Sequence, residues 1–224
     1  IVKFDEHQKM PTTRIEYSYY LMAVDAGLQM MPSRLLEGEQ TAHFLTERFD
    51  RQNGKKVHIQ TLAAMNPSAD SYEALFEAAC RIGVPPGELR QLFRSMVLNV
   101  LGGNVDDHNK NFSFLMDDDG HWHVAPTYDY TFSVDPDAPY YVNRHSMTIN
   151  NKTEGITAED LLEVARRYGI KAAEPFIEKA IGIVSHYPEY GREAGVGEEW
   201  IGTIEKEIAA RIECVSDNRA DRLK

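Results

Sequence analysis

Short apolar runs that are typical of strands dominate the first part of the chain, with one helical stretch between them. Residues 1–4 predict a buried strand, and residues 33–37 and 42–49 predict two strands around a Glu-Gly-Glu turn. Apolar positions three and four residues apart predict a helix over residues 13–26, which Gly27 stops. The expected order is therefore strand, helix and hairpin.

Helical periodicity replaces this pattern from about residue 60 onward. Residues 71–82 open with a serine suited to an N-cap, and residues 88–101 carry a wide apolar stripe that predicts a central, heavily buried helix. Directly after that helix, the apolar runs 112–116 and 121–125 flank an acidic turn that ends in glycine. We therefore expect a short hairpin there.

A long loop and further helices are predicted for the rest of the chain. Residues 133–153 are rich in Pro, Asp, Asn and Tyr, and predict an irregular loop of the kind that often has a function. Helices are expected over residues 157–168, which open with a capping-box sequence, and over residues 172–186 and 198–219.

Composition limits the class of protein. With 224 residues and 42% hydrophobic content, the chain can bury one sizeable core or form two small lobes that share a cleft. It has no run of 18 apolar residues, and its first residues do not form a secretory signal, so we expect a soluble, cytoplasmic protein without a membrane role. Cys80 and Cys214 lie far apart, which indicates neither a disulfide framework nor a zinc site.

The charge of the chain argues against direct nucleic-acid binding. The formal net charge is -11, whereas a grip on DNA or RNA needs clustered Lys and Arg. Lys55 and Lys56 follow Gly54 and are expected at a solvated hairpin tip. Any contact with nucleic acid would therefore be made through a partner.

A phosphotransferase site is indicated by the spacing of three polar residues. Asp106 and Asn111 precede the predicted hairpin, and Asp129 follows it, so a tight turn would bring them to one side. One carboxylate can take the proton of an attacking hydroxyl, while an amide oxygen and a second carboxylate hold magnesium ions. The alternative is that these residues only form turns and caps.

Nearby residues extend this site, each with a structural alternative. His108 can orient a catalytic carboxylate, and Lys110 can meet a phosphate, but either can equally be structural. Lys3 on the first strand has the position of a lysine that reaches nucleotide phosphates, with Glu16 as its ion-pair partner, or it is simply a solvated strand-end lysine. The acidic run 117–119 is explained by its turn.

Five ordered segments resemble the HipA family of serine/threonine kinases, the toxins of bacterial toxin–antitoxin systems. They are Ile-Val-Lys-Phe at 1–4, Glu16, Glu-Arg-Phe-Asp-Arg at 47–51, Val-Asp-Asp-His-Asn-Lys-Asn-Phe-Ser at 105–113 and Pro-Thr-Tyr-Asp at 126–129. The similarity extends to about residue 148. It implies an α+β, protein-kinase-like fold, in which residues 1–51 are the remainder of a nucleotide-binding N-lobe with its hinge and residues 52–224 form a helical catalytic C-lobe.

The resemblance implies ATP and Mg²⁺ as cofactors and assigns a role to each candidate residue. At the reacting end, Asp106 would be the catalytic base, beside His108 and Lys110 in the catalytic loop, with Asn111 and Asp129 as magnesium ligands and Lys3, paired with Glu16, on the phosphates. At the other end, Glu47 and Phe49 would offer backbone groups to adenine, Asp50 would lie near the ribose, Gln60 near the phosphates and Tyr128 against the adenine.

The resemblance also implies partners: a protein substrate such as an aminoacyl-tRNA synthetase, and a DNA-binding antitoxin. Asp107 stands where the family commonly has glycine, which leaves open whether Asp106 or Asp107 is the base. The family's N-terminal subdomain and Gly-rich loop would precede Lys3, so we expect this chain to be a fragment that is inert alone. Two alternatives remain: a small-molecule kinase of the aminoglycoside or choline type, and a non-catalytic, kinase-like interaction module.

Overall fold

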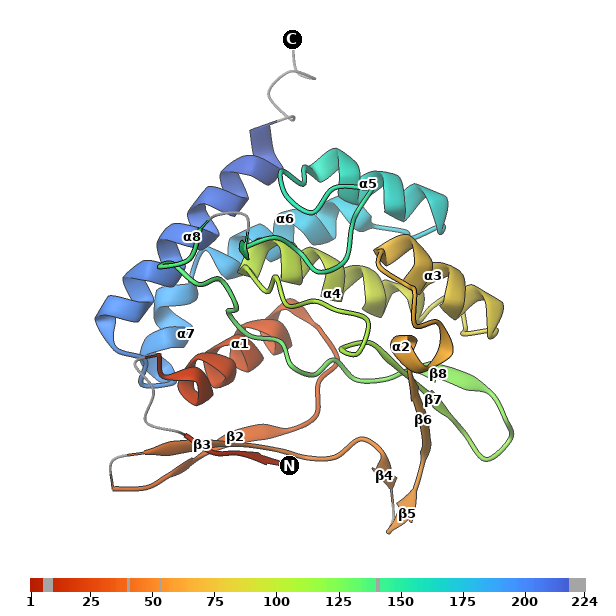
Figure 1. Ribbon diagram of the computed structural model, residues 1–224, viewed down its shortest axis with the longest axis horizontal. Coiled ribbons are helices and arrows are strands. Elements are labelled where there is room, and N and C mark those ends of the chain that lie inside the picture. Colours follow the sequence, from red (N-terminus) through yellow and green to blue (C-terminus); the bar gives the residue numbers. More distant parts are fainter. Residues whose placement is uncertain (6–9, 40, 53, 140–141, 218–224) are drawn as a thin grey trace.

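A computed structural model of the chain describes residues 1–5, 10–39, 41–52, 54–139 and 142–217 (Figure 1). Its first sheet contains β1 (Val2–Lys3), β2 (Ser33–Glu37) and β3 (Ala42–Thr46) in the antiparallel order β1-β3-β2. The register pairs Lys3 with Phe44, so the predicted phosphate-binding lysine lies on an edge strand of this sheet.

Helix α1 (Thr12–Ala26) lies between this sheet and the helical body (Figure 1). It packs against β2 and β3 on one side and against later helices on the other. It ends at Gly27, whose φ of 85° is left-handed and whose N–H donates to the carbonyls of Ala23 and Val24. The predicted helix and its glycine stop are confirmed.

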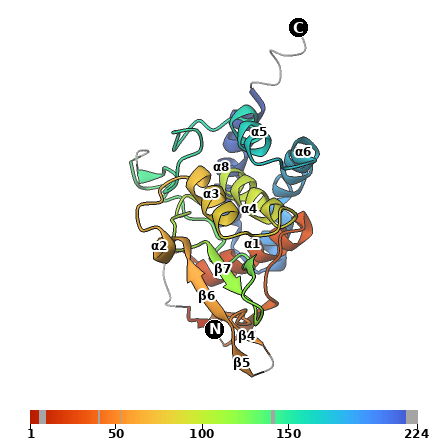
Figure 2. The same ribbon diagram turned by 90° about the vertical axis from the view of Figure 1, so that its right-hand side faces the viewer.

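A second group of strands carries the segment on which the candidate site depends. The short hairpin β4 (Arg51–Gln52) and β5 (Lys55–Lys56) confirms the predicted basic tip. Next, β6 (His58–Thr61) pairs antiparallel with β7 (Ser113–Met116), and β7 pairs with β8 (Trp122–Val124). The predicted hairpin around the acidic turn is therefore present, and Figure 2 shows this sheet below α3 and α4.

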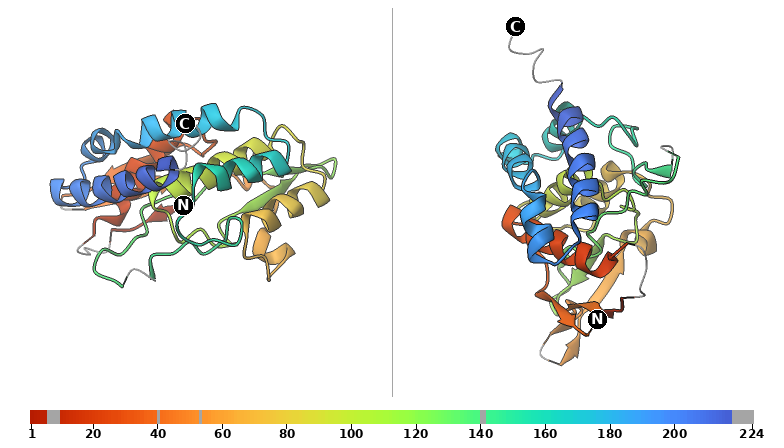
Figure 3. Two further views of the ribbon diagram at one scale, coloured as in Figure 1. Left: turned by 90° about the horizontal axis from the view of Figure 1, so that it is seen from above. Right: turned by 90° about the vertical axis from the view of Figure 1, so that its left-hand side faces the viewer.

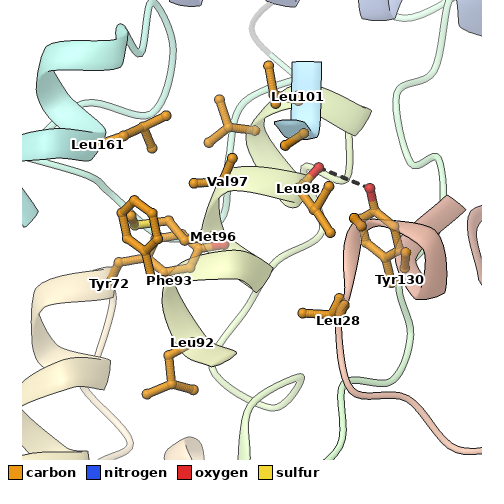
Figure 4. Close-up of a cluster of buried hydrophobic side chains, with 14 of the residues drawn as sticks. Leu28, Tyr72, Leu92, Phe93, Met96, Val97, Leu98, Leu101, Tyr130 and Leu161 are labelled. Atoms are coloured by element: carbon orange, nitrogen blue, oxygen red, sulfur yellow. Dashed lines mark hydrogen bonds between the residues drawn. The ribbon is translucent and has the colours of Figure 1, made fainter. Parts of the chain in front are cut away.

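Helix α4 (Leu89–Gly102) forms the centre of the hydrophobic core. It is reached through α2 (Leu62–Met65) and α3 (Tyr72–Arg81), whose N-cap Ser71 accepts a hydrogen bond from the Ala74 N–H. Its apolar side chains meet residues from distant segments, such as Leu28, Tyr130 and Leu161 (Figure 4). The central, buried helix expected from the apolar stripe is confirmed.

Four helices follow in the C-terminal part, of which α6 and α8 pack against α4 (Figure 3). They are α5 (Ala158–Arg167), α6 (Ala173–Val184), α7 (Tyr187–Glu193) and α8 (Glu198–Ser216). Helix α5 begins with the expected capping box, in which Thr157 and Asp160 each bond the other's backbone N–H. In the described part of the chain, no helix combines the length and apolar character needed to cross a membrane.

Two expectations differ from the structure. The strand at residues 1–4 is not buried, since Ile1 and Phe4 are 56% and 68% exposed. The reason is that β1 is an edge strand that pairs with β3 alone. The two short helices α2 and α7 were not expected. The long loop over residues 133–153 has no helix or strand in its described part.

Candidate active site

The loop between α4 and β7 lies against the segment that follows β8. Asn104 Nδ2 donates to the backbone oxygen of Asp129 at 3.4 Å, and the Ser133 hydroxyl accepts a bond from the Asp106 N–H at 3.0 Å. The hairpin β7–β8 holds the two segments together, because the Ala125 N–H continues the ladder to the Ser113 carbonyl. The predicted convergence of the hairpin's two ends is therefore observed.

Lys3 joins the first sheet to this convergence. Its Nζ lies 2.7 Å from Glu16 Oε1 and also contacts Asp129 Oδ1. The Glu16 side chain is only 10% exposed, whereas that of Lys3 is 38% exposed. Burial lowers the pKa of Lys3, but Glu16 and Asp129 outweigh that effect and the net pKa is raised. Burial also raises the pKa of Glu16, and the charge of Lys3 opposes that rise.

Asp129 has an uncommon backbone conformation. Its φ is 51°, in the left-handed region that asparagine and aspartate tolerate better than other non-glycine residues. Its carboxylate remains 44% exposed although it holds Lys3. It is thus a constrained carboxylate that is open to solvent.

Asn111 contacts the backbone of Asp106. Its Nδ2 donates to the Asp106 carbonyl at 2.8 Å, so the amide nitrogen is engaged and the side-chain oxygen is the atom available to a cation. Amide and carboxylate oxygens are ligands that Mg²⁺ prefers. The donor set of Asn111 and Asp129 therefore fits a magnesium ion.

The two neighbouring aspartates have opposite surroundings. The Asp107 side chain is fully buried and accepts bonds from the Tyr72 hydroxyl at 2.7 Å and the Ser146 N–H at 2.8 Å, while His145 Nδ1 lies 2.9 Å away. The Asp106 side chain is 67% exposed. A carboxylate enclosed in this way cannot reach a substrate, whereas Asp106 can.

The other two residues of the loop differ in their contacts. His108 Nε2 lies 3.8 Å from Asp106 Oδ1, close enough to influence that carboxylate, and its Nδ1 is buried without a hydrogen-bond partner among the described residues. The Lys110 side chain is exposed, and its carbonyl accepts the Tyr128 hydroxyl at 2.7 Å. Lys110 thus links the loop to Tyr128 through its backbone.

Two aromatic residues predicted on the adenine side lie together. The rings of Phe49 and Tyr128 are 5.4 Å apart between centroids. Burial raises the pKa of Tyr128 to about 12, so its hydroxyl stays protonated at neutral pH. The Glu47 N–H already donates to the Pro32 carbonyl at 3.1 Å, which leaves the Glu47 carbonyl as its available backbone group.

The last two candidates, Asp50 and Gln60, have contacts of their own. The Asp50 carboxylate is held by Arg48 at 2.6 Å and Arg51 at 2.7 Å, and the Arg48 hydrogen bond is the main reason why the pKa of Asp50 is lowered. Gln60 lies opposite Phe114 in the sheet, on the face that carries Trp122, and lines a different hollow of about 610 Å³ beside α2 and α3. The expected place of Gln60 near the phosphates stays a prediction.

Three contributors were not identified from the sequence. Ser133, Tyr72 and His145 contact Asp106 or Asp107, but they come from separate segments and share no spacing with the motif. Only their residue types, a hydroxyl, a phenol and an imidazole, signal them.

The acidic turn offers a second group of possible metal ligands. Asp117, Asp119 and His121 each have a ligand atom within 4.8 Å of the others, and all are exposed. The Asp117 Oδ1 accepts the backbone N–H groups of Asp119 and His121 at 3.0 and 2.8 Å. Closure of the turn accounts for this geometry.

Comparisons with known proteins identify the family of the chain. The family model of the HipA-like C-terminal domain matches residues 1–189. A Sinorhizobium fredii protein named "Putative kinase Y4mE" is 25% identical over 139 residues, which cover 55% of this chain and 33% of that protein.

Two solved structures share the fold. HipA of Shewanella oneidensis, in a complex with HipB and operator DNA, has a TM-score of 0.69 at 20% identity over 96% of this chain and 57% of its own. The proinflammatory kinase CtkA of Helicobacter pylori has a TM-score of 0.62 at 19% identity over 99% of this chain and 90% of its own. The chain thus spans a third of Y4mE and somewhat over half of HipA. Its fold is that of HipA and CtkA, and the chain belongs to the HipA-like C-terminal domain family.

Proposed function

We propose that the protein containing this chain is an ATP-dependent kinase that transfers a phosphoryl group to a serine or threonine hydroxyl of another protein, with magnesium. The observation that carries the proposal is the contact of Lys3 with both Glu16 and Asp129 beside the loop of Asp106 and Asn111. Phosphoryl transfer needs this combination of a cation for phosphates, oxygen ligands for magnesium and a free carboxylate.

Asp106 is the proposed base. Its exposed carboxylate can accept the proton of an incoming hydroxyl, while its backbone is fixed by Ser133 on the N–H side and Asn111 on the carbonyl side. His108, 3.8 Å away, is the proposed orienting neighbour. The enclosure of Asp107 supports Asp106 over Asp107 in this role.

The nucleotide is proposed to lie between Tyr128 and Lys3. Phe49 and Tyr128 would flank the adenine. The Glu47 carbonyl and the Phe49 N–H would form hydrogen bonds with the polar edge of the adenine. Asn111 and Asp129 would hold magnesium, which neutralises phosphate charge when bound. Roles for Asp50 and Gln60 stay predictions, and Asp50 would have to exchange its arginine partners to meet a ribose.

The partners are proposed from the family. HipA of Shewanella oneidensis is recorded with HipB and operator DNA, which supports a DNA-binding antitoxin as partner and a toxin role. A protein substrate of the aminoacyl-tRNA synthetase type rests on the family resemblance alone. A net charge of -11 supports contact with DNA through the partner only.

Transfer of radiolabelled phosphate from ATP by the complete protein tests this function. Asp106→Asn and Asp129→Asn should each lower the rate at least about 100-fold, because they remove the base and a metal ligand. Asparagine is chosen at 129 because it tolerates the left-handed backbone. Asp118→Asn, the same change in the exposed acidic turn, serves as control and should retain the wild-type rate.

The outcomes separate the alternatives. Label incorporated into cell protein supports the proposal, whereas label found only on a small-molecule panel indicates a metabolite kinase. Undiminished transfer in both Asn variants rules out the assigned roles. Absence of Mg-ATP binding to the complete protein by calorimetry would indicate a non-catalytic module.

A further inference from the structure

Asp107 is the centre of a buried polar cluster within an otherwise apolar core. Its side chain and that of Tyr72 are fully buried, and Asn99 and Asn104 are only 5% and 3% exposed. Buried polar groups are costly unless they are hydrogen-bonded, and an apolar set of the same volume is often at least as stable. The presence of this cluster therefore calls for a reason other than stability.

The polar groups form one continuous chain of hydrogen bonds. The Tyr72 hydroxyl donates to Asp107 at 2.7 Å and accepts from Asn99 Nδ2 at 2.9 Å, and the Asn99 oxygen accepts from Asn104 Nδ2 at 2.9 Å. Burial, with a smaller effect of the Asp107 charge, raises the pKa of Tyr72 well above its usual value, so this hydroxyl stays a donor.

The chain of hydrogen bonds that starts at Asp107 ends at the neighbouring residue, Asp106. The Ser133 hydroxyl lies 3.3 Å from Asn104 Oδ1, to which it can donate, and it accepts the N–H of Asp106 at 3.0 Å. The chain of hydrogen bonds thus runs from the carboxylate of Asp107 to the backbone N–H of Asp106. Asn104 also reaches the Asp129 carbonyl at 3.4 Å. A fully satisfied network of this kind specifies one geometry for the loop that it surrounds.

Asp107 has a further link to the C-terminal helix α8. Its partner His145 lies with Nε2 3.4 Å from Arg211 Nη1, and Arg211 is held by Glu207 at 2.8 Å. The loop is thereby attached to α3, α4 and α8, whose positions are fixed by the core. The support comes from rigid elements, which is what precise placement of a reacting group requires.

We propose that Tyr72, Asn99, Asn104 and Ser133 are positioning residues that hold the Asp106 carboxylate, and through Asn104 the Asp129 backbone, in the geometry needed for phosphoryl transfer. They touch neither nucleotide nor acceptor and act through Asp107 and the backbone of Asp106. This inference rests on the proposed function for its kinetic consequence, but its effect on the loop itself does not depend on catalysis.

Tyr72→Phe and Ser133→Ala in the complete protein test the network from its two ends. Each should lower kcat by about 10-fold or more and leave the KM for ATP within about twofold, because misplacement of a reacting group affects the transition state more than ground-state binding. The double variant should be clearly less impaired than the product of the two single effects, since both changes break one chain. Tyr187→Phe is the control, since Tyr187 is equally buried and its hydroxyl accepts a hydrogen bond from Ser18 at 3.3 Å, outside the network.

A second measurement is independent of activity. Amide hydrogen exchange at residues 104–107 should be faster in Tyr72→Phe and Ser133→Ala than in the wild type and the control, whereas exchange in α1 should be unchanged. Unchanged kcat in both single variants, or multiplicative effects with normal exchange in the loop, overturns the proposal. If the wild type transfers no phosphate, the proposed function fails, and the exchange measurement alone decides whether the network fixes the loop.

Discussion

Two adjacent aspartates illustrate how surroundings, rather than residue type, divide structural from chemical roles. Asp107 is enclosed by donors from two segments, while the side chain of Asp106 points to solvent and its backbone is held by hydrogen bonds. A buried carboxylate that loses its partners, or donors that lose their carboxylate, leave unsatisfied polar groups in the core. An exposed carboxylate has no such consequence for folding.

We therefore expect the same substitution to affect stability strongly at Asp107 and little at Asp106. Asp107→Ala should lower the free energy of unfolding by about 3 kcal/mol or more, because it strands the hydroxyl of Tyr72 and the N–H of Ser146. Asp106→Ala should change it by less than about 0.5 kcal/mol. Urea denaturation of both variants measures the difference, and a similar loss in both would contradict this division.

Sequence reasoning identified much of the candidate site but not the assignment between these aspartates. Ordered motifs led to Lys3, Glu16 and Asp129, which the structure brings into contact. Tyr72 and His145 lie 35 and 38 residues from Asp107, so no local spacing could show which aspartate they enclose. The face of the sheet on which Gln60 lies depends on strand register, because a one-residue shift in register moves each side chain of the strand to the opposite face.

His123 gives a pH dependence of known sign. Its hydrogen bond with Glu88, followed by that with Asp117, raises the pKa of His123 above its usual value. The stabilising contribution is complete below the ordinary histidine pKa of 6.5 and is lost as pH rises through the higher folded value. Because the ring is 38% exposed, we expect less than about 1 kcal/mol.

Unfolding in urea at several pH values checks this expectation. The wild type should lose stability relative to His123→Gln as the pH rises above 6.5. The control is His186→Gln, which removes a ring that contacts the Gly182 carbonyl rather than two carboxylates. A wild-type advantage that grows with pH would show that the sign is wrong.

At the scale of elements, the long periodic helices and the glycine-ended turn were predictable, whereas short elements were not. Helix α2 has four residues and α7 has seven, too few to establish a period, and α7 follows α6 after only two residues. The exposure of β1 was also beyond the sequence. A short apolar run suits a buried strand and an edge strand alike.

The contact between α7 and α8 depends on a glycine. A Cβ added at Gly191 would lie 2.9 Å from Ile201 Cγ1, closer than side chains tolerate. We expect Gly191→Ala to lower stability by about 1–3 kcal/mol through overpacking, which exceeds the helix-propensity gain of about 1 kcal/mol.

A matched substitution should have the opposite sign. At Gly202 in α8 an added Cβ meets nothing within 4 Å, so Gly202→Ala should raise stability by up to about 1 kcal/mol. Thermal unfolding of the two variants compares them directly. Stabilisation by both changes would mean that α7 and α8 are not in close contact.

At the scale of the whole molecule, the described residues share one continuous core. Side chains of α1, including Ile15 and Tyr19, belong to the same buried cluster as Ile177 of α6 and Ile204 of α8. The division at residues 51 and 52 into a lobe with a hinge and a helical lobe stays a prediction. Helix α1 lies before that division in sequence but packs with helices from beyond it.

A shared core predicts cooperative unfolding of this chain. Trp122 lies on β8 and Trp200 on α8, so the two tryptophans report on opposite parts of the fold. Fluorescence of Trp122→Phe and Trp200→Phe variants should give one urea transition each. The slope of the unfolding free energy against urea concentration should be the same in both variants, even where their midpoints differ. Clearly different slopes in the two variants would indicate lobes that unfold independently.

The contact of Lys3 with Glu16 and Asp129 has a consequence for how the resting site holds together. Two carboxylates at this spacing would repel each other, but the ammonium between them acts as a tethered counter-ion. Under the proposed function, a magnesium ion held by Asp129 would replace a cation instead of filling a bare anionic site. The ammonium of Lys3 would then be available to the phosphates, so that loading the site would exchange one ionic partner for another.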